Sequence, residues 1–254
     1  MSRRLGALCL AALLWLPIAG CDGEDLNRWR AERGLAPLSE PELSRQVDAL
    51  NRFEAELKRR ASFVGEIKEV DAARLGLSWH PGCPVGPEGL RLLRLSYWGF
   101  DGVGHVGELI VGARIAAKVV RAFNVMWNEK FPIQRMETSE KFLTPEMFDA
   151  AGNFIEQPNT ADTVNATQGF MCRRTTRASS WSRHAFGLAI DVNPVQNPYI
   201  DGALLIPLNG TRSEATGRIV QSDVVVRAMR DAGMSWGGNF RSLKDYMHFS
   251  ATGH

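Results

Sequence analysis

The sequence lacks several features that would place it in a familiar class. None of its four cysteines stands in a C-x-x-C pair, so the ligand spacing of zinc fingers and zinc ribbons is missing. Neither sign of charge is in excess, because 30 lysines and arginines stand against 28 aspartates and glutamates. A nucleic-acid-binding protein needs a basic face, so this balance argues against that class.

Internal repeats, low-complexity tracts and the S-x-x-K and K-T-G signatures of serine DD-peptidases are also missing. The stretch "GMSWG" at 233–237 does match G-x-S-x-G. That motif must run from a strand through a tight turn into a helix, whereas this stretch follows a helical pattern and enters strand-like sequence. We therefore do not expect serine chemistry.

Long hydrophobic runs are also few. The longest covers residues 5–18, and a membrane-spanning helix needs about 20 residues. Two arginines precede this run and small residues follow it, which is typical of a secretory signal over residues 1–20. The ending Ile18-Ala19-Gly20-Cys21 resembles the lipobox of bacterial lipoproteins. It predicts a lipid on Cys21 that anchors the protein to a membrane of the cell envelope; the alternative is a plain signal that leaves a free Cys21.

Two further cysteines, Cys83 and Cys172, remain once Cys9 leaves with the signal and Cys21 carries lipid. An even pair in an oxidising compartment favours a disulfide between them. The alternative is two buried thiols.

The remaining chain predicts an α+β protein. Residues 21–38 are polar and aperiodic and are expected to be a tether, and residues 39–75 form an N-terminal helical segment that starts with a capping box at Ser39 and Glu42. Residues 76–254 are the expected catalytic domain, with a strand at 107–112, a helix after it and a buried strand in "GLAIDV". Helices and strands do not alternate as βαβ units, so we expect a small mixed sheet flanked by helices.

Two pairs of polar residues carry the functional signal. His184 and Asp191 stand at the ends of an apolar stretch, and Asp245 stands three residues before His248. Each pair alone is also compatible with an ordinary core strand. Together they supply three ligands for a catalytic zinc and one acid for a general base, which is the complement such a site needs.

Small residues lie between His184 and Asp191. On a strand, Gly187, Ala189 and Asp191 would share one face, and we interpret the two small residues as leaving room for a metal and a substrate. Three other histidines have no acid at ligand spacing and are expected to have no role: His80, His105 and His254.

The ordered motifs resemble the VanY-like zinc peptidases of bacterial cell walls. The resemblance rests on the following residues: Ser182-x-His184-x-x-Gly187-x-Ala189-x-Asp191, Asp245-x-x-His248, "GCP" near Cys83, "KFPI" at 130–133, Cys172-Arg173, "NPY" at 197–199 and "WGG" at 236–238. It implies the hedgehog and DD-peptidase-like fold, zinc held by His184, Asp191 and His248, and Asp245 as the catalytic acid. It further implies that Arg173 steadies the oxyanion, with Arg174 and Arg183 close enough to compete for that role, and that Ser182 and Trp236 contact substrate.

The family resemblance implies a partner, the peptidoglycan stem peptide, and leaves the reaction open. The first expectation is a monomeric D-alanyl-D-alanine carboxypeptidase. An aspartate at 245 instead fits the branch of L-alanyl-D-glutamate endopeptidases. A third possibility is a module that keeps zinc and binds wall peptide without turnover, although such a module has no need of a base.

Overall fold

The computed structural model describes residues 23–149, 154–155, 161–175 and 180–252. The chain divides into two compact units, of which the first ends at Ser62 and the second begins at Phe63. No helix in the described ranges is long and apolar enough to cross a membrane. The expected signal and Cys21 lie outside these ranges.

From residue 23 on, where the first unit is described, it contains the helices α2 (Gly23–Ala31) and α3 (Glu40–Ala61). Part of the expected tether is therefore helical. Leu26 on α2 and Leu43 on α3 are buried, which joins the two helices. One half of the predicted capping box is present, since the Ser39 backbone N–H donates to the Glu42 carboxylate at 3.2 Å, whereas the Ser39 hydroxyl donates to the same carboxylate at 2.6 Å.

The second unit holds the sheets. Its strands are β1 (Gly65–Lys68), β2 (Leu90–Trp98), β3 (Gly104–Gly112), β4 (Arg135–Met136), β5 (Ala166–Thr167), β6 (Ala189–Asp191), β7 (Tyr199–Asp201), β8 (Leu204–Ile206), β9 (Ser235–Trp236), β10 (Lys244–Asp245) and β11 (His248–Ser250). Its α-helices are α4 (Ala72–Leu75), α5 (Ala113–Asn128) and α6 (Val224–Asp231). Its 3₁₀ helices are η1 (Gly76–Ser78), η2 (Pro87–Gly89), η3 (Ser139–Phe142), η4 (Pro145–Met147), η5 (Arg183–Phe186) and η6 (Gly237–Asn239).

The architecture is α+β, as expected, but the strands do not form one mixed sheet. Within the described ranges, three antiparallel sheets have the orders β1-β2-β3, β10-β7-β8 and β6-β11-β9, and β4 pairs with β5 in parallel. The expected start of the catalytic domain at residue 76 also differs from the structure. Strand β1 pairs with β2 from Gly65 to Lys68, so these residues belong to the second unit.

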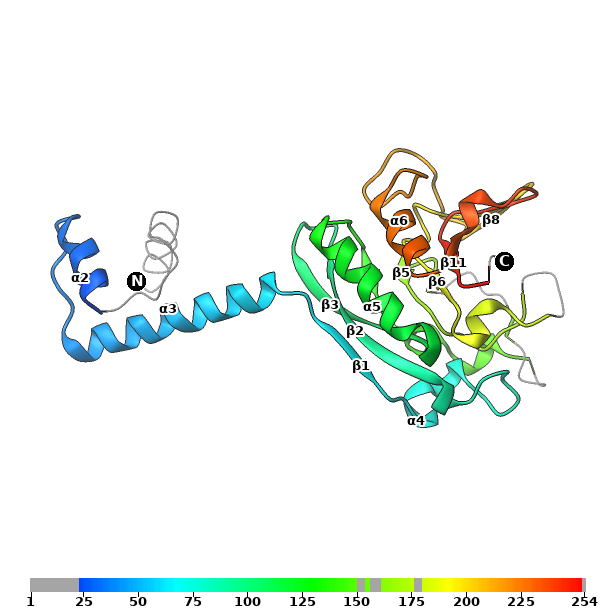
Figure 1. Ribbon diagram of the computed structural model, residues 1–254, viewed down its shortest axis with the longest axis horizontal. Coiled ribbons are helices and arrows are strands. Elements are labelled where there is room, and N and C mark those ends of the chain that lie inside the picture. The colour runs from blue at the N-terminus through cyan, green and yellow to red at the C-terminus, as the bar shows by residue number, and fades with distance from the viewer. Residues whose placement is uncertain (1–22, 150–153, 156–160, 176–179, 253–254) are drawn as a thin grey trace. The chain divides into compact units, whose positions relative to one another are not determined.

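The β1-β2-β3 sheet has a hydrophobic core on each face, and α5 lies against one of these faces (Figure 1). Leu93 and Leu95 on β2 pack with α5 in the main core, whereas Leu90 and Leu92 point into a smaller cluster with Phe170 and Cys172. This alternation follows from the two-residue period of a strand. Phe170 and Cys172 bring their part of the chain to this second cluster, and the Phe170 N–H donates to the Ile110 carbonyl of β3 at 2.7 Å.

Candidate metal centre

Two short strands and a 3₁₀ helix bring the three predicted ligands together. Asp191 ends β6 and His248 begins β11, and the antiparallel register places the two residues directly opposite each other. His184 lies on η5, just before β6. All three side chains are buried.

The ligand atoms form a tight triangle. His184 Nε2 lies 3.1 Å from Asp191 Oδ2, His248 Nδ1 lies 3.0 Å from Asp191 Oδ1, and the two ring nitrogens are 3.2 Å apart. Two ligands bonded to one tetrahedral zinc at about 2.0–2.1 Å are themselves about 3.3 Å apart. The triangle therefore has the dimensions that such an ion requires, and its nitrogen and carboxylate donors suit zinc.

The backbone fixes the orientation of His184. The Ser182 hydroxyl caps η5 by accepting the His184 N–H at 3.3 Å. The ring Nδ1 lies 2.6 Å from the Gly169 carbonyl oxygen, so Nδ1–H donates and the lone pair of Nε2 points into the triangle. A ligating histidine is held in this way in most metal sites.

Asp191 is kept ionised by its neighbours. Burial opposes the charged form, but the charges and hydrogen bonds of His184 and His248 hold the pKa of Asp191 well below its usual range. A buried carboxylate in contact with two imidazoles is a group that either pairs or binds a metal.

Asp245 lies beside the triangle without joining it. It is on β10, opposite Tyr199 of β7, and its Oδ2 is 4.0 Å from His248 Nδ1. Its Oδ1 is buried and has no hydrogen-bond partner among the described residues. Burial, with the charges of Asp191 and Asp162, raises the pKa of Asp245 to about 7. The carboxyl is thus able to exchange a proton near neutral pH.

Asp162 is a third acid at the site, after Asp191 and Asp245, and the sequence did not reveal it. Its Oδ1 accepts from Gln168 Nε2 at 2.8 Å, and burial together with the charge of Asp191 raises its pKa to about 6. Residue 162 stands in a stretch of sequence with no periodic pattern, so the sequence does not indicate where it lies. The structure places it at the site because Gln168, which bonds to Asp162, also pairs with Asp191.

Among the three candidate arginines, Arg173 is the one whose charge acts on the buried acids, while its guanidinium donates to the Arg174 carbonyl at 3.2 Å. Its charge lowers the pKa of both Asp162 and Asp245, so it acts electrostatically on the site. The Arg174 guanidinium instead lies 3.7 Å above the Trp181 ring. Arg183 is on η5 and lines the same cavity.

The two residues expected to contact substrate are both largely buried. Ser182 is 5% exposed and its hydroxyl caps η5. Trp236 is 6% exposed, and its indole N–H donates to the Tyr246 carbonyl at 2.8 Å. Both line the cavity, but their polar atoms hold the protein's own backbone.

Gly187 has a different task from the one we expected. Strand β6 begins at Ala189, and Gly187 lies before it as the C-cap of η5, with φ 64°. A Cβ there would lie 2.3 Å from the Gly112 nitrogen, whose N–H donates to the Gly187 carbonyl. The glycine is therefore required by a left-handed turn and a close backbone approach, not by space for a metal.

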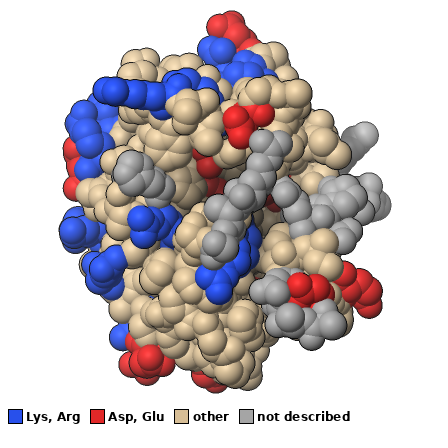
Figure 2. All heavy atoms as spheres, turned by 90° about the vertical axis from the view of Figure 1, so that its right-hand side faces the viewer, with Lys and Arg blue, Asp and Glu red and all other residues tan. Residues whose placement is uncertain are grey.

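The site opens into a cavity of about 1850 Å³. Figure 2 shows the face concerned, where Lys and Arg side chains border a recess in which acidic atoms are visible. Three aspartates, 162, 191 and 245, are the only acidic lining residues in the described part of the chain. Six arginines also line the cavity: Arg173, Arg174, Arg183, Arg227, Arg230 and Arg241. An acidic centre within a basic border fits a metal together with an anionic substrate.

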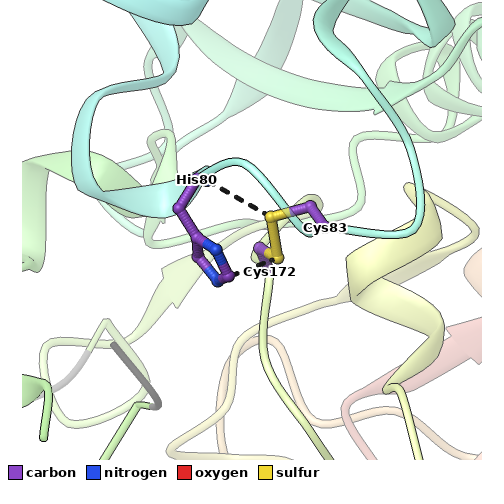
Figure 3. A group of neighbouring side chains, drawn as sticks. All are labelled: His80, Cys83 and Cys172. Atoms are coloured by element: carbon purple, nitrogen blue, oxygen red, sulfur yellow. Dashed lines mark hydrogen bonds between the residues drawn. A yellow bond between two sulfur atoms is a disulfide. The ribbon is translucent and has the colours of Figure 1, made fainter. Parts of the chain in front are cut away.

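The remaining cysteine pair lies at the edge of this cavity. Cys83 and Cys172 form a disulfide, and His80 contacts both of them (Figure 3). His80, for which we expected no role, thus lines the cavity with Cys172 and Arg173. His105 pairs instead with Asp101, and His254 lies outside the described residues.

Comparison with known proteins supports the interpretation of the motifs. No curated protein and no solved structure matches the chain. Residues 175–251 match the model of a family described as D-alanyl-D-alanine carboxypeptidase. That segment holds the three members of the triangle and Asp245, while Arg173 and the disulfide lie before it. The matched model is of the VanY-like D-alanyl-D-alanine carboxypeptidase family, so over residues 175–251 the chain is similar to the family that its motifs resemble.

Proposed function

We propose that this protein is a zinc-dependent peptidase that hydrolyses the stem peptide of bacterial peptidoglycan, in the manner of a D-alanyl-D-alanine carboxypeptidase. The observation that carries the proposal is a triangle of His184, Asp191 and His248 with a separate buried carboxylate, Asp245, next to it. Three protein ligands and a nearby general base are the parts of a hydrolytic zinc site.

When bound, zinc would supply a Lewis acid and a water whose pKa is lowered towards roughly 7. The chain's own residues account for the rest. Asp245 accepts the proton of the attacking water and returns it to the leaving amine, a role that fits a buried carboxyl beside the triangle with one oxygen that has no hydrogen-bond partner among the described residues. Arg173 stabilises the negative charge that develops on the carbonyl oxygen.

The basic border of the cavity supports an anionic substrate. Stem peptides carry free carboxylates, and a carboxypeptidase must bind the terminal one. Arginine is well suited to this because its guanidinium grips a carboxylate through two parallel hydrogen bonds. Arg183, which directly precedes His184 in sequence and lines the cavity, is our first candidate for this contact.

An L-alanyl-D-glutamate endopeptidase is a second candidate on the same substrate. The observation in its favour is the size of the cavity, since about 1850 Å³ exceeds the roughly 300–1,000 Å³ of ordinary small-ligand pockets. A cavity of that size accepts peptide on both sides of the cleaved bond. The aspartate at 245 also fits that branch of the family.

We further propose that the protein works in the cell envelope, anchored through a lipid on Cys21, and that it acts as a monomer. The support is the N-terminal sequence, with its arginines, its apolar run and the cysteine after small residues. Cys21→Ala is expected to release the protein from membranes, as measured by fractionation of cells. Equal membrane association of the variant and the wild type would exclude this anchor.

The test of the activity is digestion of purified muropeptides by the mature protein, followed by mass spectrometry. Loss of a terminal D-alanine identifies the carboxypeptidase, and cleavage after L-alanine identifies the endopeptidase. Either activity should disappear with a chelator and return with zinc. Binding of muropeptide with no product at any metal concentration would identify a non-catalytic module and exclude both enzymes.

A further inference from the structure

The described part of the protein contains a second cluster of metal-binding side chains, which shares no residue with the triangle of His184, Asp191 and His248. His80, Cys83 and Cys172 place one ring nitrogen and two sulfurs within 4.8 Å of one another (Figure 3). The sulfurs are joined in this structure as a disulfide. The position of His80 is not needed for that bond.

His80 and Cys83 form a turn with metal-ligand spacing. Two residues separate them, and the Cys83 N–H donates to the His80 carbonyl at 3.1 Å. In return, the His80 backbone N–H donates to Cys83 Sγ at 3.2 Å. Pairs of ligands two to four residues apart on a tight turn are typical of structural zinc sites, and an N–H bonded to sulfur favours the thiolate that a metal needs.

The ring of His80 is held in the tautomer that a ligand requires. Nδ1 lies 3.0 Å from the Pro81 carbonyl oxygen, so it carries the proton and donates. Nε2 keeps its lone pair and lies 3.5 Å from Cys172 Sγ. Metal-binding histidines usually donate one ring N–H to a carbonyl or carboxylate, which leaves the other ring nitrogen free to bind the metal.

Cys172 supplies the third ligand from a distant part of the chain. Its backbone N–H donates to the Ser78 carbonyl at 2.9 Å, which ties it to the turn before His80. The Cys172 side chain is buried: it is 4% exposed and lies in the smaller hydrophobic cluster with Trp79, Val85 and Trp181. The fold, and not the disulfide alone, therefore brings Cys172 to the turn.

We propose that reduction of this disulfide converts the cluster into a second metal site, which binds one zinc ion through Cys83, Cys172 and His80. A dithiol transfers two electrons and two protons to the bridge, becomes a cyclic disulfide itself and leaves two thiols. Zinc then displaces the two thiol protons and accepts the lone pair of His80 Nε2. Two sulfurs and one nitrogen form a softer donor set than the nitrogen and oxygen ligands of the triangle, so the two sites are chemically distinct.

Cobalt(II) is the probe, because only sulfur ligands give sulfur-to-cobalt charge-transfer absorption. The full chain is reduced with a phosphine, which has no thiol of its own, and titrated with Co²⁺ beside an oxidised sample. We expect the reduced protein to bind one more equivalent than the oxidised protein and to show the sulfur band. His184→Ala should keep this band, which separates it from the peptidase triangle and from the proposed peptidase activity.

His80→Ala is the decisive variant, and His105→Ala is its control. His105 is exposed and pairs with Asp101, so its loss should change nothing. His80→Ala should weaken cobalt binding in the reduced protein at least about tenfold. Removal of a group that only hydrogen-bonds to a metal ligand already lowers metal affinity by about that factor. Equal affinity in His80→Ala and wild type would overturn the proposal. So would a reduced wild type without the sulfur band, whether or not its circular dichroism shows that it is still folded.

Discussion

Asp191 and Asp245 are carboxylates of one cluster, but their contacts assign them different tasks. Both oxygens of Asp191 are engaged, one by each histidine, and those contacts keep it ionised. Asp245 is 4.0 Å from His248, and one of its oxygens has no hydrogen-bond partner among the described residues. The first arrangement suits the ligand and the second suits the general base that we propose.

Substitution should separate these tasks. Asp191→Ala is expected to lower bound zinc, measured by atomic emission, and activity with it. Asp245→Asn is expected to keep near-stoichiometric zinc and to lose roughly 10²–10⁴-fold in kcat, the usual contribution of general acid–base catalysis.

The exposed Asp231, which pairs with Arg230, offers a matched control as Asp231→Asn. It should keep both zinc and rate. If Asp245→Asn loses the metal while Asp191→Ala retains it, the two roles are exchanged. Full zinc and full turnover in both variants would place the site elsewhere.

The raised pKa of Asp245 also predicts how the metal-free protein responds to pH. An aspartate in an unfolded chain has a pKa of about 3.9, while burial raises that of Asp245 to about 7. Between these values the folded state binds more protons than the unfolded state, so the free energy of unfolding falls as pH rises. With a chelator present, Asp245→Asn should therefore lose less stability between about pH 4 and 7 than wild type does.

Urea unfolding at the two pH values measures this difference. Asp231→Asn again serves as the control and should follow wild type. Asp162, whose pKa is raised to about 6, contributes in the same direction, so some pH dependence will persist in Asp245→Asn. An unchanged slope in Asp245→Asn would show that its carboxyl is not the group that titrates.

The sequence revealed residues whose type and spacing are informative by themselves, and missed those defined by the fold. His184, Asp191, Asp245 and His248 stand in two short motifs, and the structure brings them together. Asp162 meets them only because Gln168 pairs with Asp191. His80 gains a context only because Cys172 lies beside it in space, and the separation between Cys83 and Cys172 is 89 residues.

At the scale of elements, the turn between η5 and β6 fixes the angle at which His184 enters the site. Gly187 has φ 64°, and the missing side chain admits the Gly112 nitrogen. Gly202, in the turn between β7 and β8, has φ 59°, but a Cβ added there would meet no atom within 4 Å. The two glycines thus share a conformation and differ in their surroundings.

Alanine at each position should separate strain from crowding. Gly202→Ala should cost about 1–2 kcal/mol, the penalty of the left-handed region. Gly187→Ala should cost that amount and about 1–3 kcal/mol more, because Gly112 must move. Chemical denaturation measures both, and zinc affinity should fall in Gly187→Ala alone. Equal losses of stability would show that the contact with Gly112 can relax.

The sequence predicted long elements better than the pairing of short ones. The helix after residue 112 and the strand at 107–112 carry clear periodicity, and both are present as α5 and β3. Strands β9, β10 and β11 have two or three residues each, too few to show a period. Their division into separate sheets depends on long-range contacts, so a single mixed sheet was the wrong expectation.

At the scale of the whole molecule, the division at Ser62 separates helices α2 and α3 from every residue of the two metal-binding clusters. The second unit contains both hydrophobic cores, one on each face of the β1-β2-β3 sheet. Residues 63–254 alone should therefore fold, bind zinc and hydrolyse soluble muropeptides at a rate similar to that of the mature protein.

Thermal unfolding and product formation by the 63–254 fragment test this expectation. The fragment lacks Cys21, so it should also be absent from membranes. A fragment that begins at residue 76 is the matched comparison: it lacks β1 and should be less stable, since β1 pairs with β2 along its length. An unfolded 63–254 fragment would mean that the first unit supports the second.

Asp191 and His248 lie opposite each other on paired strands, so the register of β6 and β11 decides whether a folded molecule has a complete metal site. Strands β6 and β11 are three residues long, and a slip of one position would turn His248 to the other side of the sheet. A copy paired out of register would keep almost all of its secondary structure and yet hold only part of the metal site. Zinc content would therefore count the correctly paired molecules in a preparation, which neither circular dichroism nor yield can do.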